Sequence, residues 1–361
     1  MRRLTRRQLI ALAAAGGAWL ETCRAGTTGT EAPQARPGAP RTKEITLRDT
    51  LPVQMFGKTG HRLPLLACGG SAMVEKWAAG YGVQLPSFGN RVAMVRHAYD
   101  MGVRYFDSSR NYGESESIVG EALRDVRGNI YLATKVGVRA ADQGILEPQQ
   151  VRASVEESLR TLKTDYLDCL QIHGPTYEYM GYNRALQIYE ELVKLREERL
   201  FRFIGVTGHT AFETMHKLID TRLFDQVFLA YGYFPKGMDT ILSHANLQWR
   251  ELVLSRAREL GMGMLAMKVL GSFVLGHNAG KIVPEFDSKK LRAVRQAALR
   301  WALRDKQPPV LVVGVSLPSD IDENVETLRG DRTFTAEDQK LLAEFSAKAL
   351  QSKVIQALKT T

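Results

Sequence analysis

Residues 103–137 read VRYFDSSRNYGESESIVGEALRDVRGNIYLATKVG, and they contain two strand-like runs on either side of a helical one. The runs at 103–109 and 130–137 are short and apolar, whereas residues 114–126 carry apolar side chains at helical spacing. Two strands that flank a helix are typical of a parallel β-α-β unit, because parallel neighbours require a long crossover connection. The stretch therefore predicts α/β architecture.

The same alternation recurs along the rest of the chain. Six more strand-like runs lie at residues 63–70, 167–174, 201–209, 226–233, 262–271 and 310–316. Five more segments have helical periodicity, at residues 148–162, 183–199, 211–221, 249–260 and 289–305. Eight strands that alternate with helices predict a (β/α)8 TIM barrel. An open parallel sheet is the alternative, but it requires a reversal of strand order for which the sequence shows no sign.

The barrel is expected to carry an extension at each end. The turn residues Gly-Lys-Thr-Gly at 57–60 predict an N-terminal hairpin before the first barrel strand. The helical segment near 335–350 lies outside the eightfold repeat, and we expect it to pack beside the barrel as an extra C-terminal helix. Pro148 and Asp287 stand where a first-turn proline and a helix cap are favoured.

Composition and charge exclude several classes of protein. Of the 361 residues 44% are hydrophobic, which is typical of a globular protein and not of a disordered chain. Three cysteines cannot form a disulfide framework in so long a chain, and we expect Cys68 and Cys169 to be buried apolar residues in strands. The net charge is +10, but basic and acidic residues alternate after the N-terminus without a basic stripe, so no nucleic-acid partner is expected.

The N-terminal residues predict a targeting segment. Residues 1–25 join a basic start to an apolar run at 9–20, which is too short to span a bilayer as a conventional helix. The string TRRQLI at 5–10 resembles the twin-arginine export signal, which implies export in the folded state through the twin-arginine machinery to the periplasm. Residues 26–43 are rich in Thr, Ala, Gly and Pro and predict a flexible linker before a folded domain at 44–361. Contact with the membrane is expected only through the signal segment, for which an amphipathic helix or a lipidated Cys23 is the alternative.

Polar residues at the carboxyl ends of the predicted strands indicate the functional site, because that face holds the active site of such barrels. Asp107 ends the second strand, with Tyr112 just beyond it, while Lys135 ends the third strand and His173 the fourth. Singly, a strand-end Asp is typical of a turn and an isolated His is typical of a core, but the four converge on one mouth. Together they suit proton delivery to a carbonyl: an ammonium lowers the pKa of a phenol, a carboxylate holds the ammonium, and an imidazole orients the oxygen. None of the four is a nucleophile, so the hydride must come from a cofactor.

The strings YFDSSRNYGESE at 105–116, ATK at 133–135 and LDCLQIH at 167–173 resemble the aldo-keto reductase superfamily, and the similarity extends from about Phe56 to Asn324. The resemblance implies a barrel that binds a nicotinamide dinucleotide, usually NADPH, without a Rossmann fold. It implies Tyr112 as the general acid, Lys135 and Asp107 as the groups that tune it, and His173 as the residue that positions the substrate. The expected reaction is reduction of an aldehyde or ketone.

The same resemblance implies a set of cofactor-binding residues. They are Gly69, Gly70, Ser71, Asp107, Thr207, Gly208, His209, Met267, Lys268, Leu270, Gly314, Ser316, Glu323 and Asn324. The string MKVLG at 267–271 resembles a bacterial subgroup in which the lysine meets the pyrophosphate. Two positions depart from the family pattern: Gly208 stands where an Asn usually binds the carboxamide, and Asp320 stands where members that prefer NADPH often carry Arg. NADP(H) is nevertheless favoured over NAD(H), since other basic residues could bind the phosphate.

The rest of the sequence bears on other cofactors, on the substrate pocket and on alternative functions. The sequence shows no metal-ligand spacing and no cysteine cluster after the barrel, so neither a metal nor an iron–sulfur cluster is expected. Aromatic residues in three long loops are expected to wall a substrate pocket: Trp77, Tyr81, Tyr177, Tyr179, Tyr182 and Phe273. The alternatives are oxidation of a sugar or alcohol in the reverse direction, and a nucleotide-binding barrel with little turnover.

Overall fold

The structure is a computed structural model, and it describes residues 44–47, 51–80, 84–276, 279–304 and 310–360. All of these residues belong to one compact unit, Ala35–Thr361. The predicted signal segment at 1–25 and linker at 26–43 lie outside the described residues.

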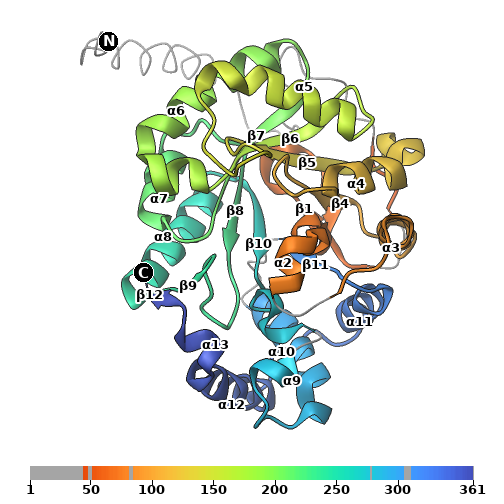
Figure 1. The fold of residues 1–361 in the computed structure, drawn as a ribbon, viewed down its shortest axis with the longest axis vertical. Helices are drawn as coiled ribbons and strands as arrows, with labels where there is room; N and C mark the ends of the chain where they lie inside the picture. The colour runs from red at the N-terminus through yellow and green to blue at the C-terminus, as the bar shows by residue number, and fades with distance from the viewer. Residues whose placement is uncertain (1–43, 48–50, 81–83, 277–278, 305–309, 361) are drawn as a thin grey trace, which may run out of the picture. The chain divides into compact units, whose positions relative to one another are not determined.

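Eight parallel strands close into a barrel, in the order β10-β11-β3-β4-β5-β6-β7-β8, which confirms the predicted (β/α)8 fold (Figure 1). The strands are β3 (Leu66–Gly69), β4 (Tyr105–Asp107), β5 (Tyr131–Val136), β6 (Leu167–Ile172), β7 (Phe201–Gly208), β8 (Gln226–Ala230), β10 (Gly263–Met267) and β11 (Val310–Gly314). Every residue of β5, β6 and β8 is buried. This burial explains why the strand sequences are continuous apolar runs, since a parallel sheet is covered on both faces.

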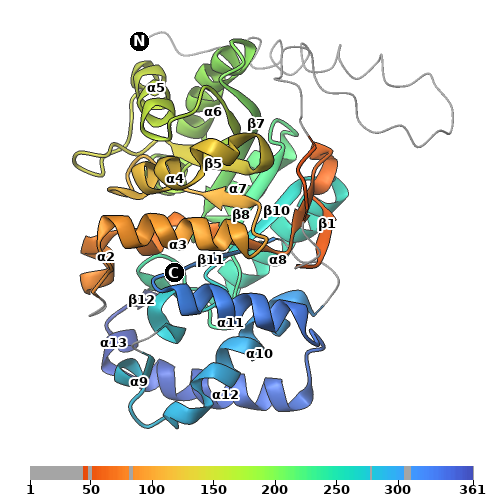
Figure 2. The same ribbon diagram turned by 90° about the vertical axis from the view of Figure 1, so that its right-hand side faces the viewer.

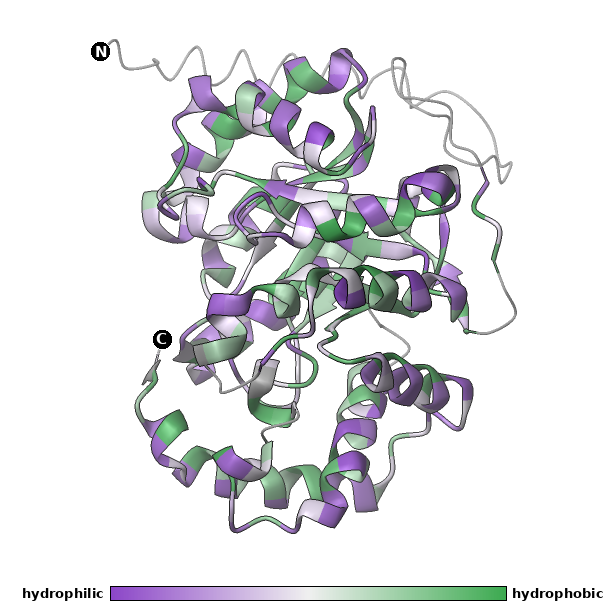
Figure 3. Cartoon of the chain, turned by 45° about the vertical axis from the view of Figure 1, so that its right-hand side comes forward, coloured by the Kyte–Doolittle hydropathy of each residue, from purple (hydrophilic) through white to green (hydrophobic). Residues whose placement is uncertain are grey.

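Helices surround the strands (Figure 2). Each of them buries one face, which is largely apolar. They are α3 (Phe88–Asp100), α4 (Ser115–Leu123), α5 (Val151–Thr161), α6 (Pro175–Glu197), α7 (Phe212–Asp220), α8 (His244–Glu259), α10 (Leu291–Leu303) and α11 (Pro318–Arg329). Figure 3 shows the result: hydrophobic residues gather on the strands and inner helix faces, and hydrophilic ones face outward.

Two of these helices, α3 and α11, were absent from the sequence-based prediction. The buried face of α3 includes Arg91, which donates to the Met73 carbonyl oxygen at 2.9 Å and pairs with Glu114 at 2.6 Å. This buried cation interrupts the apolar periodicity by which a helix is recognised. The sequence indicates only a cofactor-binding role for the segment of α11, which in the structure is also a helix that begins at Pro318.

The N-terminal hairpin is confirmed, with β1 (Val53–Met55) paired to β2 (Arg62–Pro64) across a short turn. The predicted first residue of the strand at 63–70 is wrong, because residues 63–64 belong to the hairpin and the barrel strand β3 begins at Leu66. The hairpin packs Phe56, 1% exposed, against the rings of Tyr105 and Tyr131 in the barrel. Gly57 permits this approach, because a Cβ there would lie 2.4 Å from the backbone nitrogen of Gly263.

The C-terminal extension is also confirmed. Helix α12 (Ala336–Gln351) packs against α10, where Leu342 and Phe345 belong to a second apolar cluster. A short helix, α13 (Lys353–Gln356), leads to β12 (Lys359–Thr360), which pairs in parallel with β9 (Thr240–Ile241). Within the described ranges, no helix has the length and apolar character that a membrane crossing requires.

Candidate active site

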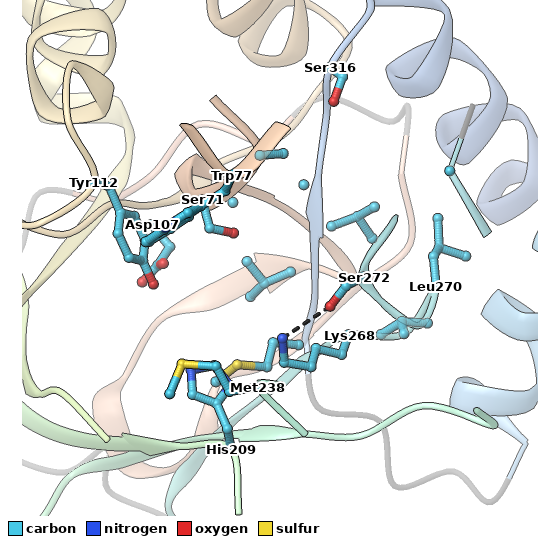
Figure 4. A pocket seen from close by; sticks show the side chains of 18 of the residues that line it. Ser71, Trp77, Asp107, Tyr112, His209, Met238, Lys268, Leu270, Ser272 and Ser316 are labelled. Carbon is cyan, nitrogen blue, oxygen red and sulfur yellow. Dashed lines mark hydrogen bonds between the residues drawn. The ribbon is translucent and has the colours of Figure 1, made fainter. Parts of the chain in front are cut away.

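A cavity of about 710 Å³ opens at the carboxyl ends of the barrel strands. Its wall includes Gly69 at the end of β3, Asp107 at the end of β4, Met267 at the end of β10 and Gly314 at the end of β11. Figure 4 shows Tyr112 and Asp107 on one side of it, with His209 and Lys268 on another. The volume lies in the range of small-molecule and cofactor sites in proteins.

The structure brings the four predicted catalytic residues together. Lys135 on β5 donates from Nζ to Asp107 Oδ2 and, at 2.7 Å, to the carbonyl oxygen of Ser108. The same Nζ lies 4.7 Å from the centre of the Tyr112 ring, and the rings of Tyr112 and His173 are 5.7 Å apart. All four side chains are buried, and Asp107, Tyr112 and His173 line the cavity.

Gln171 is a residue of this cluster that sequence reasoning missed. Its Nε2 donates to Asp107 Oδ1 at 2.8 Å, so the two carboxylate oxygens are bound by different partners, Gln171 and Lys135. Gln171 lies on β6 two residues before His173, and alternation along the strand was the signal that could have found it.

The protonation states follow from burial and from Lys135. Burial disfavours the Lys135 ammonium, but the adjacent Asp107 carboxylate outweighs it and raises the pKa of Lys135 above the ordinary value. Burial, followed by the charge of Lys135, holds the pKa of His173 well below its usual range. His173 is therefore neutral at pH 7 and has one ring N–H to donate, while its Nδ1 lies 3.4 Å from Ser109 Oγ.

Tyr112 differs from the sequence-based prediction of a lowered pKa. Lys135 does lower the pKa of Tyr112, but burial has the larger effect and Asp107 adds to it, so the pKa is raised above its ordinary value. The prediction was wrong because it considered the neighbouring charge without the loss of hydration. At neutral pH the phenol is therefore protonated and can act as an acid.

The loop between β4 and α4 holds Tyr112 through polar contacts with a distant loop. Ser109 Oγ donates to Asn111 Oδ1 at 2.6 Å, and Asn111 Nδ2 donates to Gln143 Oε1 at 2.7 Å. In turn, Gln143 Nε2 donates a hydrogen bond to the backbone carbonyl oxygen of Asn111 at 3.2 Å. Asn111 and Gln143 both line the cavity beside Tyr112 and were not identified from the sequence.

Most of the predicted cofactor-binding residues line the cavity. Those in its wall are Gly69, Ser71, Asp107, His209, Met267, Lys268, Leu270, Gly314, Ser316, Glu323 and Asn324. Gly70, Thr207 and Gly208 lie behind the wall. A Cβ on Gly70 would be 2.1 Å from Ser115 Oγ, which explains why a glycine stands there.

Gly208 stands where the family pattern has Asn because the space beside it is filled. A Cβ on Gly208 would be 2.0 Å from the hydroxyl oxygen of Tyr177. That hydroxyl donates to the Thr207 carbonyl oxygen at 2.9 Å. Tyr177 therefore packs behind the wall and is not one of the residues that line the pocket.

Thr207 Oγ1 and His209 Nδ1 are buried polar atoms that lack a hydrogen-bond partner, as are Gln171 Oε1 and Thr176 Oγ1 nearby. Glu178 holds His209 in place by accepting its backbone N–H at 2.6 Å. Burial with the charge of Lys268 keeps the pKa of His209 well below its usual value, so the ring is neutral. A buried polar atom without a partner is costly, and of these four residues only His209 lines the cavity. Its Nδ1 therefore fits a ligand that carries an amide group, as nicotinamide does.

Lys268 lies on the same side of the cavity as His209, in a left-handed conformation with φ 60°. Its Nζ donates to Ser272 Oγ at 3.0 Å (Figure 4). Burial, with the nearby Lys236 ammonium, lowers the pKa of Lys268 to about 7. A lysine that is costly to charge fits an anionic ligand group, which would restore the charge.

The loops above the mouth contribute part of the aromatic wall that the sequence predicted. Trp77 and Tyr179 line the cavity, and the Trp77 ring lies 5.2 Å from that of Tyr112. Tyr182 is not among the lining residues, while Tyr81 and the side chain of Phe273 lie outside the described residues. Met238 and Asp239, from the segment between β8 and β9, also line the mouth and were not predicted.

The prediction for Cys68 and Cys169 is confirmed. Cys68 and Cys169 are free and buried, as expected. No group of three or more His, Cys, Asp or Glu side chains suited to a metal ion occurs among the residues described here.

The fold and the cluster of Tyr112, Lys135, Asp107 and His173 define a barrel-type oxidoreductase. The model of the aldo/keto reductase family matches residues 76–347. The chain belongs to the aldo/keto reductase family.

Individual relatives agree with this assignment. L-galactose dehydrogenase from Arabidopsis thaliana is 28% identical over 284 residues, an alignment that covers 71% of this chain and 83% of the plant protein. Among solved structures, the aldo-keto reductase AKR11C1 from Bacillus halodurans, in its holo form, superposes with a TM-score of 0.61 and 18% identity over 84% of this chain and 99% of that one. A putative aldo-keto reductase from Pseudomonas aeruginosa superposes with a TM-score of 0.59 and 21% identity, over 79% of this chain and 96% of that one. At these identities, the solved structures show the shared fold.

Proposed function

We propose that this protein reduces an aldehyde or ketone to an alcohol, with hydride from a nicotinamide dinucleotide and the proton from Tyr112. The observation that carries the proposal is the cluster of a protonated Tyr112, a charged Lys135 and a neutral His173 at one cavity. Membership of the family supports the oxidoreductase class. His209 Nδ1, a buried atom without a hydrogen-bond partner in the cavity wall, supports the nicotinamide.

The residues of the cluster have two roles, substrate binding and proton transfer. His173 and Tyr112 bind the carbonyl oxygen and orient it, each by donating a hydrogen bond. When bound, the dinucleotide supplies the hydride to the carbonyl carbon. As negative charge develops on the oxygen, Tyr112 transfers its proton, and Lys135 stabilises the phenolate that remains. The Ser108 carbonyl and the Asp107 carboxylate hold Lys135 at the position where this charge appears, and Gln171 holds Asp107.

Other residues of the wall would hold the dinucleotide. His209 fits its amide, and Lys268 fits its pyrophosphate. Ser316, Glu323 and Asn324 line the remaining part of the same cavity and would hold the adenosine end. We also propose that the chain belongs to the bacterial subgroup that the string MKVLG at 267–271 resembles.

Oxidation of a sugar or alcohol is the second candidate, and the similarity to L-galactose dehydrogenase favours it. That direction requires Tyr112 to act as a base, whereas its raised pKa keeps it protonated at pH 7. Reduction should therefore dominate at neutral pH, and oxidation should increase as the pH rises toward the pKa of Tyr112. Initial rates in both directions from pH 6 to 10 distinguish the two candidates.

The test of the function compares Tyr112→Phe with the unchanged protein. We expect removal of the hydroxyl to lower kcat for aldehyde reduction by about a hundredfold or more, since the general acid is lost. The dissociation constant of the dinucleotide, measured by fluorescence quenching, should change little. Tyr166→Phe is the matched control, because that ring stacks on Arg127 away from the cavity. Bound dinucleotide without oxidation by any carbonyl would support the alternative of a binding barrel with little turnover, and no binding would contradict the proposal.

We propose further that the protein is exported to the periplasm by the twin-arginine machinery. The support is the string TRRQLI at residues 5–10, with the apolar run and the linker that follow it. Export in the folded state is compatible with a cofactor that binds in the cytoplasm and is carried out with the protein.

A further inference from the structure

We propose that Asp320 makes the cavity select NAD(H) and discriminate against NADP(H). The inference rests on the proposed function, because it concerns which dinucleotide that site binds. It runs against the preference for NADP(H) expected from the sequence. The two dinucleotides differ only in a phosphate on the 2′ position of the adenosine ribose, so the charges around that ribose decide the selection.

The location of the ribose follows from the shape of the cavity. Hydride transfer requires the nicotinamide to lie beside Tyr112, and the rest of the dinucleotide must occupy the remainder of the same cavity. Figure 4 shows Ser316 well apart from Tyr112 and from His209. Ser316, Asp320, Glu323 and Arg295 line this far end, which is the part left for the adenosine.

Asp320 occupies the position at which a phosphate would otherwise bind. One carboxylate oxygen, Oδ2, accepts the backbone N–H of Ser316 at 2.8 Å and that of Leu317 at 2.9 Å. These N–H groups lie where helix α11 begins, and such groups are typical ligands of phosphate. Here the chain's own carboxylate satisfies both of them, so they are not available to a 2′-phosphate.

Arg295 lies at the same end, but it is already paired. Its Nε donates to Glu323 Oε1 at 2.7 Å and its Nη2 donates to Glu323 Oε2 at 2.9 Å. This two-bond geometry is the strong arrangement between a guanidinium and a carboxylate. A phosphate would have to displace Glu323 and leave that partly buried carboxylate without its partner.

Among the described residues, the carboxylates of Asp320 and Glu323 and the guanidinium of Arg295 at this far end sum to a charge of −1. A 2′-phosphate carries about two negative charges at neutral pH and is repelled there. A ribose 2′-hydroxyl carries none and can donate a hydrogen bond to a carboxylate oxygen, as in other sites that select NAD. The same groups that exclude the phosphate thus accept the hydroxyl.

The experiment measures binding of NADH and of NADPH to the full-length chain by calorimetry, with 5′-ADP and 2′,5′-ADP as probes of the adenosine end alone. We expect NADH to bind about tenfold tighter or more, and 5′-ADP to bind tighter than 2′,5′-ADP. In Asp320→Asn the charge is lost while a side-chain oxygen remains to accept the helix N–H groups. The NADPH dissociation constant should fall about tenfold in this variant, and that of NADH should change little.

Asp322→Asn is the matched control, because it removes a carboxylate from the same helix. Asp322 contacts His97 at 2.7 Å and does not line the cavity. The selectivity of this variant should equal that of the unchanged protein.

Equal or tighter binding of NADPH by the unchanged protein, or equal effects of the two substitutions, would overturn the inference and leave the proposed function standing. If neither dinucleotide binds, the proposed function fails and the inference fails with it. The wild-type ratio decides the matter even if Asp320→Asn folds poorly.

Discussion

The charge of Lys268 responds to pH near neutrality, because its pKa is lowered to about 7. An exposed lysine has a pKa near 10.4, so between about pH 7 and 10.4 the unfolded chain binds more protons at this position than the folded one. The contribution of Lys268 to stability therefore rises with pH through that window. An anionic pyrophosphate beside the ammonium would raise the pKa again.

This coupling predicts that dinucleotide binding takes up a proton above pH 7. The affinity should be constant below about pH 7 and should weaken by up to about tenfold per pH unit above it. Lys268→Met should bind more weakly at pH 6 and should show no such dependence. Calorimetry in two buffers with different ionisation enthalpies measures the proton uptake. A pH dependence that is unchanged in Lys268→Met would contradict the role of this lysine.

Three strands of the barrel are joined at their amino ends by one buried carboxylate. Asp168 on β6 accepts from Arg202 on β7 at 2.6 Å and from the Leu132 backbone N–H on β5 at 2.9 Å. Arg127 lies 2.9 Å from the same side chain. Asp168 and Arg202 are buried, so the loss of the carboxylate would leave charge without a partner.

Asp168→Ala is therefore expected to lower the free energy of unfolding by about 3–5 kcal/mol, as when one partner of a buried ion pair is removed. Denaturant titration measures the change. The residue does not line the cavity, so kcat and KM per folded molecule should stay near those of the unchanged protein. Asp165→Ala is the control, because Asp165 is exposed and lies three residues before Asp168. This substitution should change the free energy of unfolding little. A loss of activity without a loss of stability would contradict this structural role.

The C-terminal strand supports the mouth of the cavity at the level of elements. Strand β12 pairs with β9, and β9 ends the segment that contributes Met238 and Asp239 to the mouth. A chain that stops after Leu358 loses this pairing, whose hydrogen bonds contribute about 1 kcal/mol each. We expect KM for the carbonyl substrate to rise about fivefold with a smaller change in kcat. Steady-state kinetics test this, and an unchanged KM with an unchanged melting temperature would show that β12 does not support the mouth.

For the whole molecule, the proposed export predicts where the protein accumulates. Replacement of Arg6 and Arg7 by lysine should keep the protein in the cytoplasm, because a twin-arginine signal is recognised by its receptor through those residues. Arg2 and Arg3 replaced by lysine provide the control with the same number of changes. Fractionation of periplasm and cytoplasm, with dinucleotide content measured in each, gives the result. Equal distribution of both variants and the unchanged protein would contradict the proposal.

The sequence by itself determined the barrel and most of the candidate site. Alternating apolar runs and helical segments predicted the eight strands, because each strand must be buried on both faces and each helix on one. The chemistry of strand ends located Asp107, Lys135 and His173, because parallel strands place their carboxyl ends on one face. Helix α3 escaped this reasoning because a salt-bridged Arg91 on its buried face breaks the pattern.

The tertiary structure decided what depends on contacts between distant segments. Gln171 against Asp107, Asn111 against Gln143, and Tyr177 in the space beside Gly208 leave no periodic signal in the sequence. The raised pKa of Tyr112 was also decided there, because it depends on how far packing removes the phenol from water. Periodicity reports which face of an element is buried, whereas the partners and protonation state of a polar atom depend on what other elements place against it.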